Sequence, residues 1–155
     1  MKKRDIVIIM ITLIIDQITK SIAAAHVIVP VTVIDDFFYL AYAENTGMAW
    51  SMLSNATWLL TILSVVITIF LLWLYHSSYR SHEDLMCLCQ SFMIAGAIGN
   101  LIDRAVFGYV RDFLAFNIFG YAFPIFNVAD MALTIGAIVW ILYCLLIEGK
   151  KVNHE

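Results

Sequence analysis

The chain has 155 residues, of which 63% are hydrophobic and only 14% are charged, and its mean hydropathy is +0.90. A soluble domain is closer to half apolar and a quarter charged, so this composition excludes an ordinary soluble protein and indicates a membrane protein. The net charge of -3 says little, because short loops set its sign, but the absence of a basic run argues against a nucleic-acid partner. The length leaves room for about four membrane spans.

Four apolar segments predict four transmembrane helices, at about residues 6–29, 58–75, 85–102 and 128–147. The first segment follows MKKR and contains three alanines, which resembles a cleavable signal peptide. Because Asp16 and Lys20 interrupt its apolar part, and because it is long enough to span, we interpret it as a membrane helix. We expect one integral-membrane domain over residues 1–155, built as an all-α bundle of four helices.

The distribution of lysine and arginine predicts that both termini are cytoplasmic, since these residues favour the cytoplasmic side. Residues 30–57 and 104–127 then face outward. The first of these segments is rich in β-branched and aromatic residues from Pro30 to Trp50, which predicts a small extracytoplasmic β-sheet on the membrane surface. The second is predicted to be an extracytoplasmic loop. The basic residues on the cytoplasmic side would be Lys2, Lys3, Arg4, Arg80, Lys150 and Lys151.

Polar residues gather near the outer ends of the predicted spans. A charged side chain at a span centre costs about 2.5–3.5 kcal/mol, so several at one depth predict a shared polar site. The i, i+4 spacing of Asp16 with Lys20, and of Asn100 with Arg104, places each pair on one helix face. A purely structural Asp16–Lys20 ion pair, or an Arg104 that snorkels to the interface, would explain these residues equally well. The remaining members are Asp103, Asn127 and Asp130.

Two aspartates, Asp112 and Asp130, stand beside very apolar stretches of the chain. Burial among apolar walls raises the pKa of a carboxylate, and two carboxylates brought together tend to share one proton. Such a pair supplies a base and an acid at the same pH, which is what aspartic peptide hydrolysis needs. The sequence contains no G-x-S-x-G, H-E-x-x-H or P-loop motif, and its histidines and cysteines lack ligand spacing, so we expect no metal and no cofactor.

Two other classes of protein remain open at this point. A proton-coupled transporter or small channel would use the same carboxylates as relay groups, and it predicts polar residues through the full depth of the membrane. A membrane scaffold without enzymatic activity would use them only to pair with Arg104 and Arg111. In that case, removing either aspartate would harm folding and nothing else.

Five short strings, in order along nearly the whole chain, resemble the bacterial lipoprotein signal peptidases, also called signal peptidase II. Each string is weak by itself, but five in one four-span chain make a specific pattern. The strings are DQITK (16–20), ENTGMAW (44–50), AGAIGNLIDR (95–104), VRDF (110–113) and FPIFNVAD (123–130).

The resemblance implies an aspartyl endopeptidase of the bacterial plasma membrane, with its active site near the outer face. Members of this family remove signal peptides from diacylglyceryl-modified prolipoproteins, cutting before the lipidated cysteine, and globomycin-type inhibitors block them. Substrates and membrane lipid are therefore the expected partners. The resemblance places the catalytic pair at Asp112 and Asp130, and its supporting positions at Asp16, Lys20, Asn45, Gly47, Asn100, Arg104 and Asn127.

The chain departs from the family pattern at two positions. Arg111 stands before the first of the two aspartates, where an apolar residue is usual, and Met131 follows the second, where serine is common. Adjacent side chains diverge in an extended strand, so we expect Arg111 to have little direct effect on Asp112.

Overall fold

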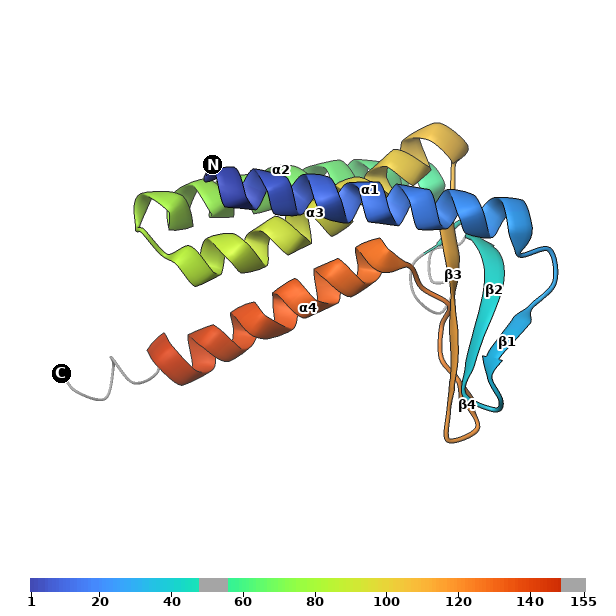
Figure 1. Cartoon of the computed structure of the whole chain (residues 1–155). Helices are drawn as coiled ribbons and strands as arrows, with labels where there is room; N and C mark the ends of the chain where they lie inside the picture. The colour runs from blue at the N-terminus through green and yellow to red at the C-terminus, as the bar shows by residue number, and fades with distance from the viewer. Residues whose placement is uncertain (48–55, 149–155) are drawn as a thin grey trace.

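The computed structural model describes residues 1–47 and 56–148 and combines a bundle of long helices with a small sheet (Figure 1). The helices are α1 (Lys3–His26), α2 (Thr57–Arg80), α3 (Asp84–Phe107) and α4 (Val128–Tyr143), and a π-helical turn, η2 (Cys144–Glu148), continues α4. The antiparallel sheet has the order β1 (Val31–Ile34), β2 (Phe38–Asn45), β3 (Val110–Ile118) and β4 (Tyr121–Ala122).

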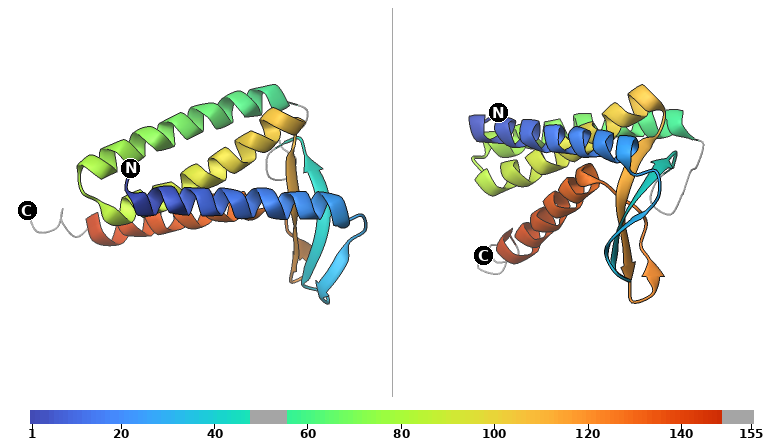
Figure 2. Two further views of the ribbon diagram at one scale, coloured as in Figure 1. Left: turned by 45° about the horizontal axis from the view of Figure 1, so that its top comes forward. Right: turned by 45° about the vertical axis from the view of Figure 1, so that its right-hand side comes forward.

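Helices α1, α2 and α3 are each long and apolar enough to cross a membrane, and so is α4 together with the turn that continues it, over Val128–Leu146. Their outward faces carry apolar side chains, as Ile11, Ile15, Ile18 and Ile22 of α1 illustrate with about half of their surface exposed. Such faces suit contact with lipid, because a helix hydrogen-bonds its backbone polar groups internally and leaves none unpaired in the bilayer. The predicted fold, four membrane helices with a small sheet, is confirmed. The start of α1 and the end of α4 lie at one end of the bundle, and the sheet lies at the other (Figures 1 and 2).

The helix boundaries differ from the predicted spans. The polar stretch 76–80 lies beyond the predicted second span, but it continues α2. Tyr75 and Ser78 are buried there, and the Gln90 side-chain amide of α3 donates to the Ser78 hydroxyl at 3.0 Å. Likewise α3 continues beyond residue 102, so Arg104 lies in a helix and not in the outer segment. It ends where Gly108 adopts a left-handed φ of 82°, a conformation that favours glycine.

The second outer segment is not a simple loop, and that expectation was wrong. Strand β3 pairs with β2 over the register from Phe38↔Phe116 to Asn45↔Val110, so both outer segments build one sheet. The sequence of β3 is rich in the aromatic and apolar residues that favour strands. The predicted sheet segment begins as expected, with β1 and β2, while its last residues, 48–50, lie outside the described part of the chain.

Glycines in α3 let the neighbouring helices approach closely. A Cβ atom on Gly96 would lie 2.2 Å from the Ala129 carbonyl oxygen of α4, and one on Gly99 would lie 2.7 Å from an Asp16 carboxylate oxygen of α1. Small residues at helix contacts let helices pack closely in membranes. These contacts bring α1, α3 and α4 together just where their polar residues lie.

Candidate active site

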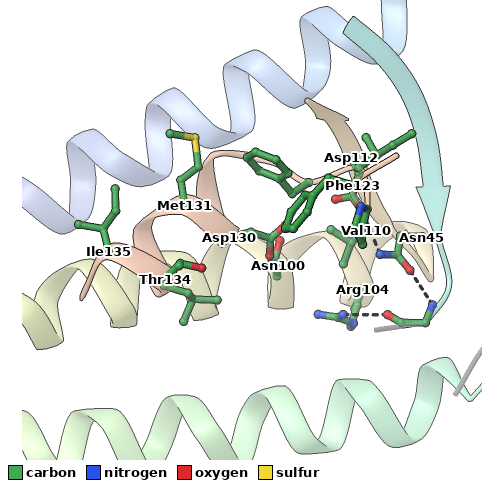
Figure 3. Close-up of a pocket in the computed structure, with 15 residues that line it drawn as sticks. Asn45, Asn100, Arg104, Val110, Asp112, Phe123, Asp130, Met131, Thr134 and Ile135 are labelled. Atoms are coloured by element: carbon green, nitrogen blue, oxygen red, sulfur yellow. Dashed lines mark hydrogen bonds between the residues drawn. The ribbon is translucent and has the colours of Figure 1, made fainter. Parts of the chain in front are cut away.

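A cavity of about 580 Å³ opens where the sheet meets α3 and α4 (Figure 3). Its wall combines two carboxylates with a few polar groups and a larger apolar surface. The polar lining residues are Asn45, Gly47, Asn100, Arg104, Asp112, Asp130 and Thr134. The apolar ones are Val110, Phe123, Pro124, Ile125, Phe126, Met131, Leu133 and Ile135.

Strand geometry aims Asp112 into this cavity. Asn45 pairs with Val110 across the sheet, and side chains of directly opposite residues share a face, as do alternate residues along a strand. Asn45, Val110 and Asp112 therefore point to the same side, and all three line the cavity. The Asn45 amide donates to the Asp112 carboxylate at 2.9 Å.

Asp112 is only 2% exposed, and burial is the main reason that its pKa rises to about 6. The neighbouring charge of Asp130 raises the pKa further. Hydrogen bonds from Asn45 and Asn127 act in the opposite direction, because they stabilise the ionised form, and the charge of Lys20 does the same. The Asp112 carboxyl thus changes protonation much closer to neutral pH than an ordinary aspartate does.

Asp130 occupies the first turn of α4, where a capping box holds it. The Asn127 side chain accepts from the Asp130 backbone N–H at 2.9 Å, and the Asp130 carboxylate accepts from the Asn127 backbone N–H at 3.2 Å. Reciprocal bonds of this kind satisfy backbone donors that a helix start leaves without partners. The other Asp130 oxygen accepts from the Asn100 amide at 2.7 Å. The i, i+3 spacing of Asn127 and Asp130 is the feature of the sequence that indicates this capping box.

Two asparagines connect the carboxylates. The Asn127 side-chain amide donates to Asp112 at 2.6 Å and to the Asn100 side-chain oxygen at 3.2 Å, and the Asn100 side-chain amide in turn donates to Asp130. Asn127 is fully buried, so these bonds are shielded from water. The arrangement fixes both carboxylates on one cavity wall while leaving them open to a bound molecule.

Asp16 and Lys20 lie behind the cavity and form the ion pair that their spacing predicts, with Nζ 2.9 Å from the carboxylate. Both side chains are almost completely buried. Lys20 also donates to the Asn100 side-chain oxygen at 3.0 Å, and Asp16 accepts from the Ala129 backbone N–H at the start of α4 at 2.8 Å. The pair therefore braces the residues that hold Asp130.

Arg104 and Gly47 lie on the sheet side of the cavity. The Arg104 guanidinium donates to the Gly47 carbonyl oxygen at 3.3 Å and to the Ser64 hydroxyl of α2 at 3.4 Å. The Gly47 N–H donates to the Asn45 side-chain oxygen at 2.9 Å, which orients the amide toward Asp112. Arg104 thus lines the cavity, whereas the sequence alone also allowed it to be an anchor that snorkels to the membrane interface.

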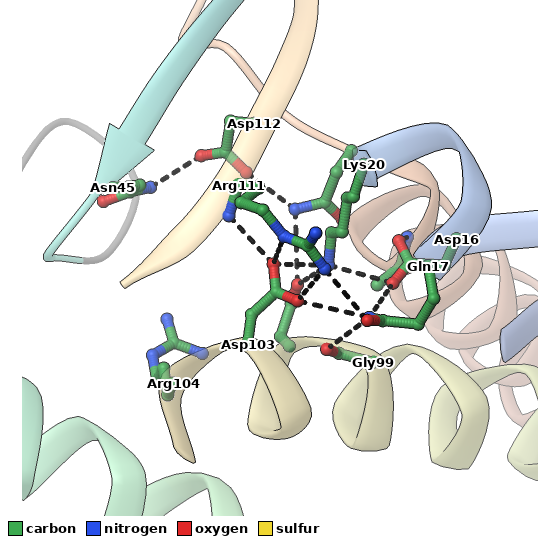
Figure 4. Close-up of polar contacts among 12 residues, drawn as sticks. Asp16, Gln17, Lys20, Asn45, Gly99, Asp103, Arg104, Arg111 and Asp112 are labelled. Atoms are coloured by element: carbon green, nitrogen blue, oxygen red, sulfur yellow. Dashed lines mark hydrogen bonds and ion pairs between the residues drawn. The ribbon is translucent and has the colours of Figure 1, made fainter. Parts of the chain in front are cut away.

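Sequence reasoning missed a second buried ion pair, between Asp103 and Arg111 (Figure 4). Asp103 is fully buried, and its carboxylate accepts from the Arg111 guanidinium at 2.8 Å and from the Arg111 backbone N–H at 2.9 Å. Gln17 joins them, since its amide donates to Asp103 at 3.2 Å. The spacing of eight residues crosses a turn from helix to strand, so no helical or strand period indicates this pair.

A buried pair of carboxylates in a cavity between membrane helices is the kind of acid–base site that an aspartic-type peptidase requires. Among the described residues, no group of three or more His, Cys, Asp or Glu side chains could hold a metal ion.

Comparison with known proteins identifies the family. The family model described as "Signal peptidase (SPase) II" matches residues 8–146. The chain is 42% identical over 141 residues to a "Lipoprotein signal peptidase" of Staphylococcus haemolyticus (strain JCSC1435), covering 90% of this chain and 88% of that protein. It is 40% identical over 141 residues to the protein of the same name from Staphylococcus carnosus (strain TM300), covering 90% and 87%.

Solved structures agree with this match. Two are described as a bacterial membrane enzyme determined by the in meso method, one at 2.3 Å and one at 1.9 Å resolution. Both are 37% identical to the chain, with TM-scores of 0.84 and 0.81, covering 96% and 93% of this chain and 90% and 94% of theirs. The chain belongs to the signal peptidase II family, and it is a multi-pass membrane protein and an aspartic-type peptidase that removes signal peptides from lipoproteins.

Proposed function

We propose that Asp112 and Asp130 are the catalytic dyad of this peptidase and that it cleaves diacylglyceryl-modified prolipoproteins just before the lipidated cysteine. The observation that carries the proposal is that both carboxylates line one cavity and are joined through Asn127 and Asn100. The high pKa of Asp112 supports it further, because a proton can then be shared within the pair near neutral pH.

Hydrolysis follows from this arrangement. The ionised carboxylate takes a proton from a water molecule, whose oxygen attacks the scissile carbonyl carbon. The neutral carboxyl donates a hydrogen bond to the carbonyl oxygen, where negative charge develops. As the carbon–nitrogen bond breaks, the proton passes to the leaving amine, and the dyad again holds one proton. Asn45, Asn100 and Arg104 are placed to hold backbone carbonyl groups of an extended substrate on the same wall.

The apolar part of the cavity suits a lipid-modified substrate. Met131 and Ile135 follow Asp130 along α4, away from the sheet (Figure 3). An acyl chain or an apolar signal peptide entering sideways from the bilayer would meet this surface, and each buried CH₂ contributes about 0.8 kcal/mol. This is enough to discriminate lipidated from unmodified substrate. Globomycin-type inhibitors would occupy the same cavity.

The charge distribution supports an orientation with both termini in the cytoplasm and the cavity near the outer face of the plasma membrane. Lys2, Lys3, Arg4 and Arg80 lie at the end of the bundle away from the sheet, opposite the cavity. Lys150 and Lys151, which contribute to the same prediction, lie outside the described residues.

The alternative, a proton-coupled transporter that uses the same carboxylates, finds less support. A relay needs polar groups through the membrane depth. An apolar core instead separates the cavity from the polar residues at the far end of the bundle. This core includes Ile9, Leu13, Leu71, Ile94 and Leu133.

The proposed function is tested with the purified protein in lipid and two forms of one prolipoprotein, with and without diacylglycerol on the cysteine. We expect cleavage of the lipidated form only, at the bond before the cysteine, as mass spectrometry of the products would reveal, and we expect globomycin to block it. Equal cleavage of both forms would contradict the proposed substrate class. No cleavage of either form, together with proton movement across the membrane, would favour the transporter.

A further inference from the structure

Arg111 is a charged residue next to the cavity, and the proposed reaction gives it no role. It precedes Asp112 in β3, is only 6% exposed, and lies outside the residues that line the cavity. Two of its guanidinium nitrogens, Nε and Nη2, donate to the two Asp103 oxygens at 3.2 and 2.8 Å. A two-pronged contact of this kind fixes orientation as well as charge.

The same guanidinium ties three elements together (Figure 4). Its Nη2 donates to the Gln17 side-chain oxygen of α1 at 2.9 Å, and its Nη1 donates to the Ser21 hydroxyl at 3.2 Å. The carbon at its centre lies 4.5 Å from the centroid of the Phe107 ring of α3. Strand β3 is therefore fastened to α1 and α3 at the residue next to Asp112.

The buried charges behind the cavity balance only if Arg111 is included. Two carboxylates, Asp16 and Asp103, face two cations, Lys20 and Arg111, and Lys20 lies within reach of both carboxylates, at 2.9 Å and 3.5 Å. Because Arg111 neutralises Asp103, Lys20 stays with Asp16 and donates to Asn100. Without Arg111, the unpaired Asp103 charge would draw Lys20 away from Asn100.

We infer that Arg111 is a positioning residue for the peptidase reaction, an inference that rests on the proposed function of Asp112 and Asp130. It acts through two contacts. It anchors the strand that presents Asp112. By neutralising Asp103 it also leaves Lys20 to hold the Asn100 side-chain oxygen, so that the Asn100 amide stays on Asp130.

Four proteins test this inference: Arg111→Met, Arg111→Lys, Asp103→Asn, and the double variant Asp103→Asn with Arg111→Met. Arg80→Met serves as the matched control, because Arg80 is exposed at the end of α2 remote from the cavity. Each protein is purified in lipid, its folded fraction is measured by size-exclusion chromatography, and kcat and KM for a lipidated prolipoprotein are determined per folded molecule.

We expect Arg111→Met to lower kcat by about a hundredfold with a smaller change in KM, as for a displaced catalytic group. Arg111→Lys keeps the charge but not the two-pronged contact, so its kcat should lie between those of the parent and Arg111→Met. The double variant restores the charge balance, so it should exceed Arg111→Met in kcat by about tenfold or more. Because it buries no unpaired charge, it keeps the test decisive if Arg111→Met fails to fold.

The inference would be overturned if Arg111→Met had the same kcat as the parent. It would also be overturned if the fold-reduction of kcat in the double variant equalled the product of the fold-reductions in the two single variants. A lower thermal stability of the variants combined with unchanged kcat per folded molecule would overturn it as well, because the pair would then be purely structural. Cleavage by the parent separates these results from a failure of the proposed function, since a parent that does not cleave would remove both.

Discussion

At the scale of single residues, the carboxyl of Asp112 combines burial with two amide donors. Burial and the charge of Asp130 raise its pKa to about 6, whereas the amides of Asn45 and Asn127 favour its ionised form. The folded protein therefore binds a proton at this residue up to a higher pH than the unfolded chain, whose aspartates titrate at the usual value of 3.8. The ionised form of Asp112 therefore lowers the stability of the folded protein.

This cost predicts a pH-dependent gain in stability for Asp112→Asn. In the parent, stability falls as pH rises from about 4 to about 6, since the folded state holds the proton more tightly in that window. The variant has no such group. A pKa difference of about two units corresponds to about 3 kcal/mol, so the stability of the variant relative to the parent should grow by up to that amount between pH ~4 and pH ~7.

Thermal unfolding in detergent micelles at several pH values measures this difference. A constant offset between the two proteins is expected from the altered hydrogen bonds and is not part of the prediction. A difference that stays flat from pH ~4 to pH ~7 would contradict the raised pKa of Asp112.

Asn45→Ala removes one of the two donors to Asp112. Because a hydrogen bond to a charged group contributes about 1.5–3 kcal/mol, we expect kcat to fall by about tenfold or more and the acid limb of the rate profile to move to higher pH. Asn117→Ala is the matched control, as Asn117 lies in β3 outside the cavity lining. Parental kcat in Asn45→Ala would show that the donor plays no part in the reaction.

At the scale of secondary structure, close contact between helices sets the distance between the carboxylates and their supports. Gly96 of α3 meets the Ala129 backbone, one residue before Asp130, with no room for a methyl group. Protein interiors this tight respond to one added carbon by shifting the backbone. The position of Asp130 relative to Asn100 thus depends on the close contact of Gly96 with the residue before Asp130.

Gly96→Ala should therefore lower both stability and activity. Overpacking of this kind costs about 1–3 kcal/mol, and pushing α4 away from α3 should reduce kcat by about a hundredfold. Gly120→Ala adds the same methyl group in open space at the β3–β4 turn, at a left-handed φ of 84°, so it should cost stability without lowering kcat. Thermal unfolding and kcat per folded molecule distinguish the two. Equal kcat values for both variants would refute the packing argument.

The sequence predicts much of this architecture, because the length of an apolar segment and the position of polar residues along it are local features of the chain. The sequence could not predict that β3 joins the sheet, because the pairing partner of a strand lies elsewhere in the chain. It also could not predict that α2 continues through residues 76–80, where the packing of Ser78 against Gln90 outweighs the polar composition. The Asp16–Lys20 pair is periodic and was visible in the sequence. The Asp103–Arg111 pair depends on tertiary geometry and was not.

At the scale of the whole molecule, the sheet caps one end of the bundle (Figure 2). The cavity is lined by residues of both the sheet and the helices, so it lies at their junction. The proposed orientation puts that junction at the outer face, where lipidated substrates would arrive. Phe119, at the β3–β4 turn, is fully exposed on the sheet side, and Arg80 is exposed at the opposite end of the bundle.

The orientation predicts the accessibility of single cysteines introduced at these two positions. In a Cys144→Ser background, a membrane-impermeant maleimide should label Phe119→Cys in intact spheroplasts, and it should label Arg80→Cys only after permeabilisation. The native Cys87 and Cys89 are buried, so they should contribute little labelling. The reverse pattern would place the cavity on the cytoplasmic side.

The most direct test of the catalytic dyad compares cleavage of a lipidated prolipoprotein by the parent, Asp112→Asn and Asp130→Asn, with Asp35→Asn at an exposed turn as the control. Loss of general acid–base catalysis predicts that each dyad variant, folded in lipid, cleaves at least about 10²-fold more slowly, while the control cleaves at the parental rate. Parental cleavage by either folded dyad variant would contradict the account, because the reaction would not need that carboxylate.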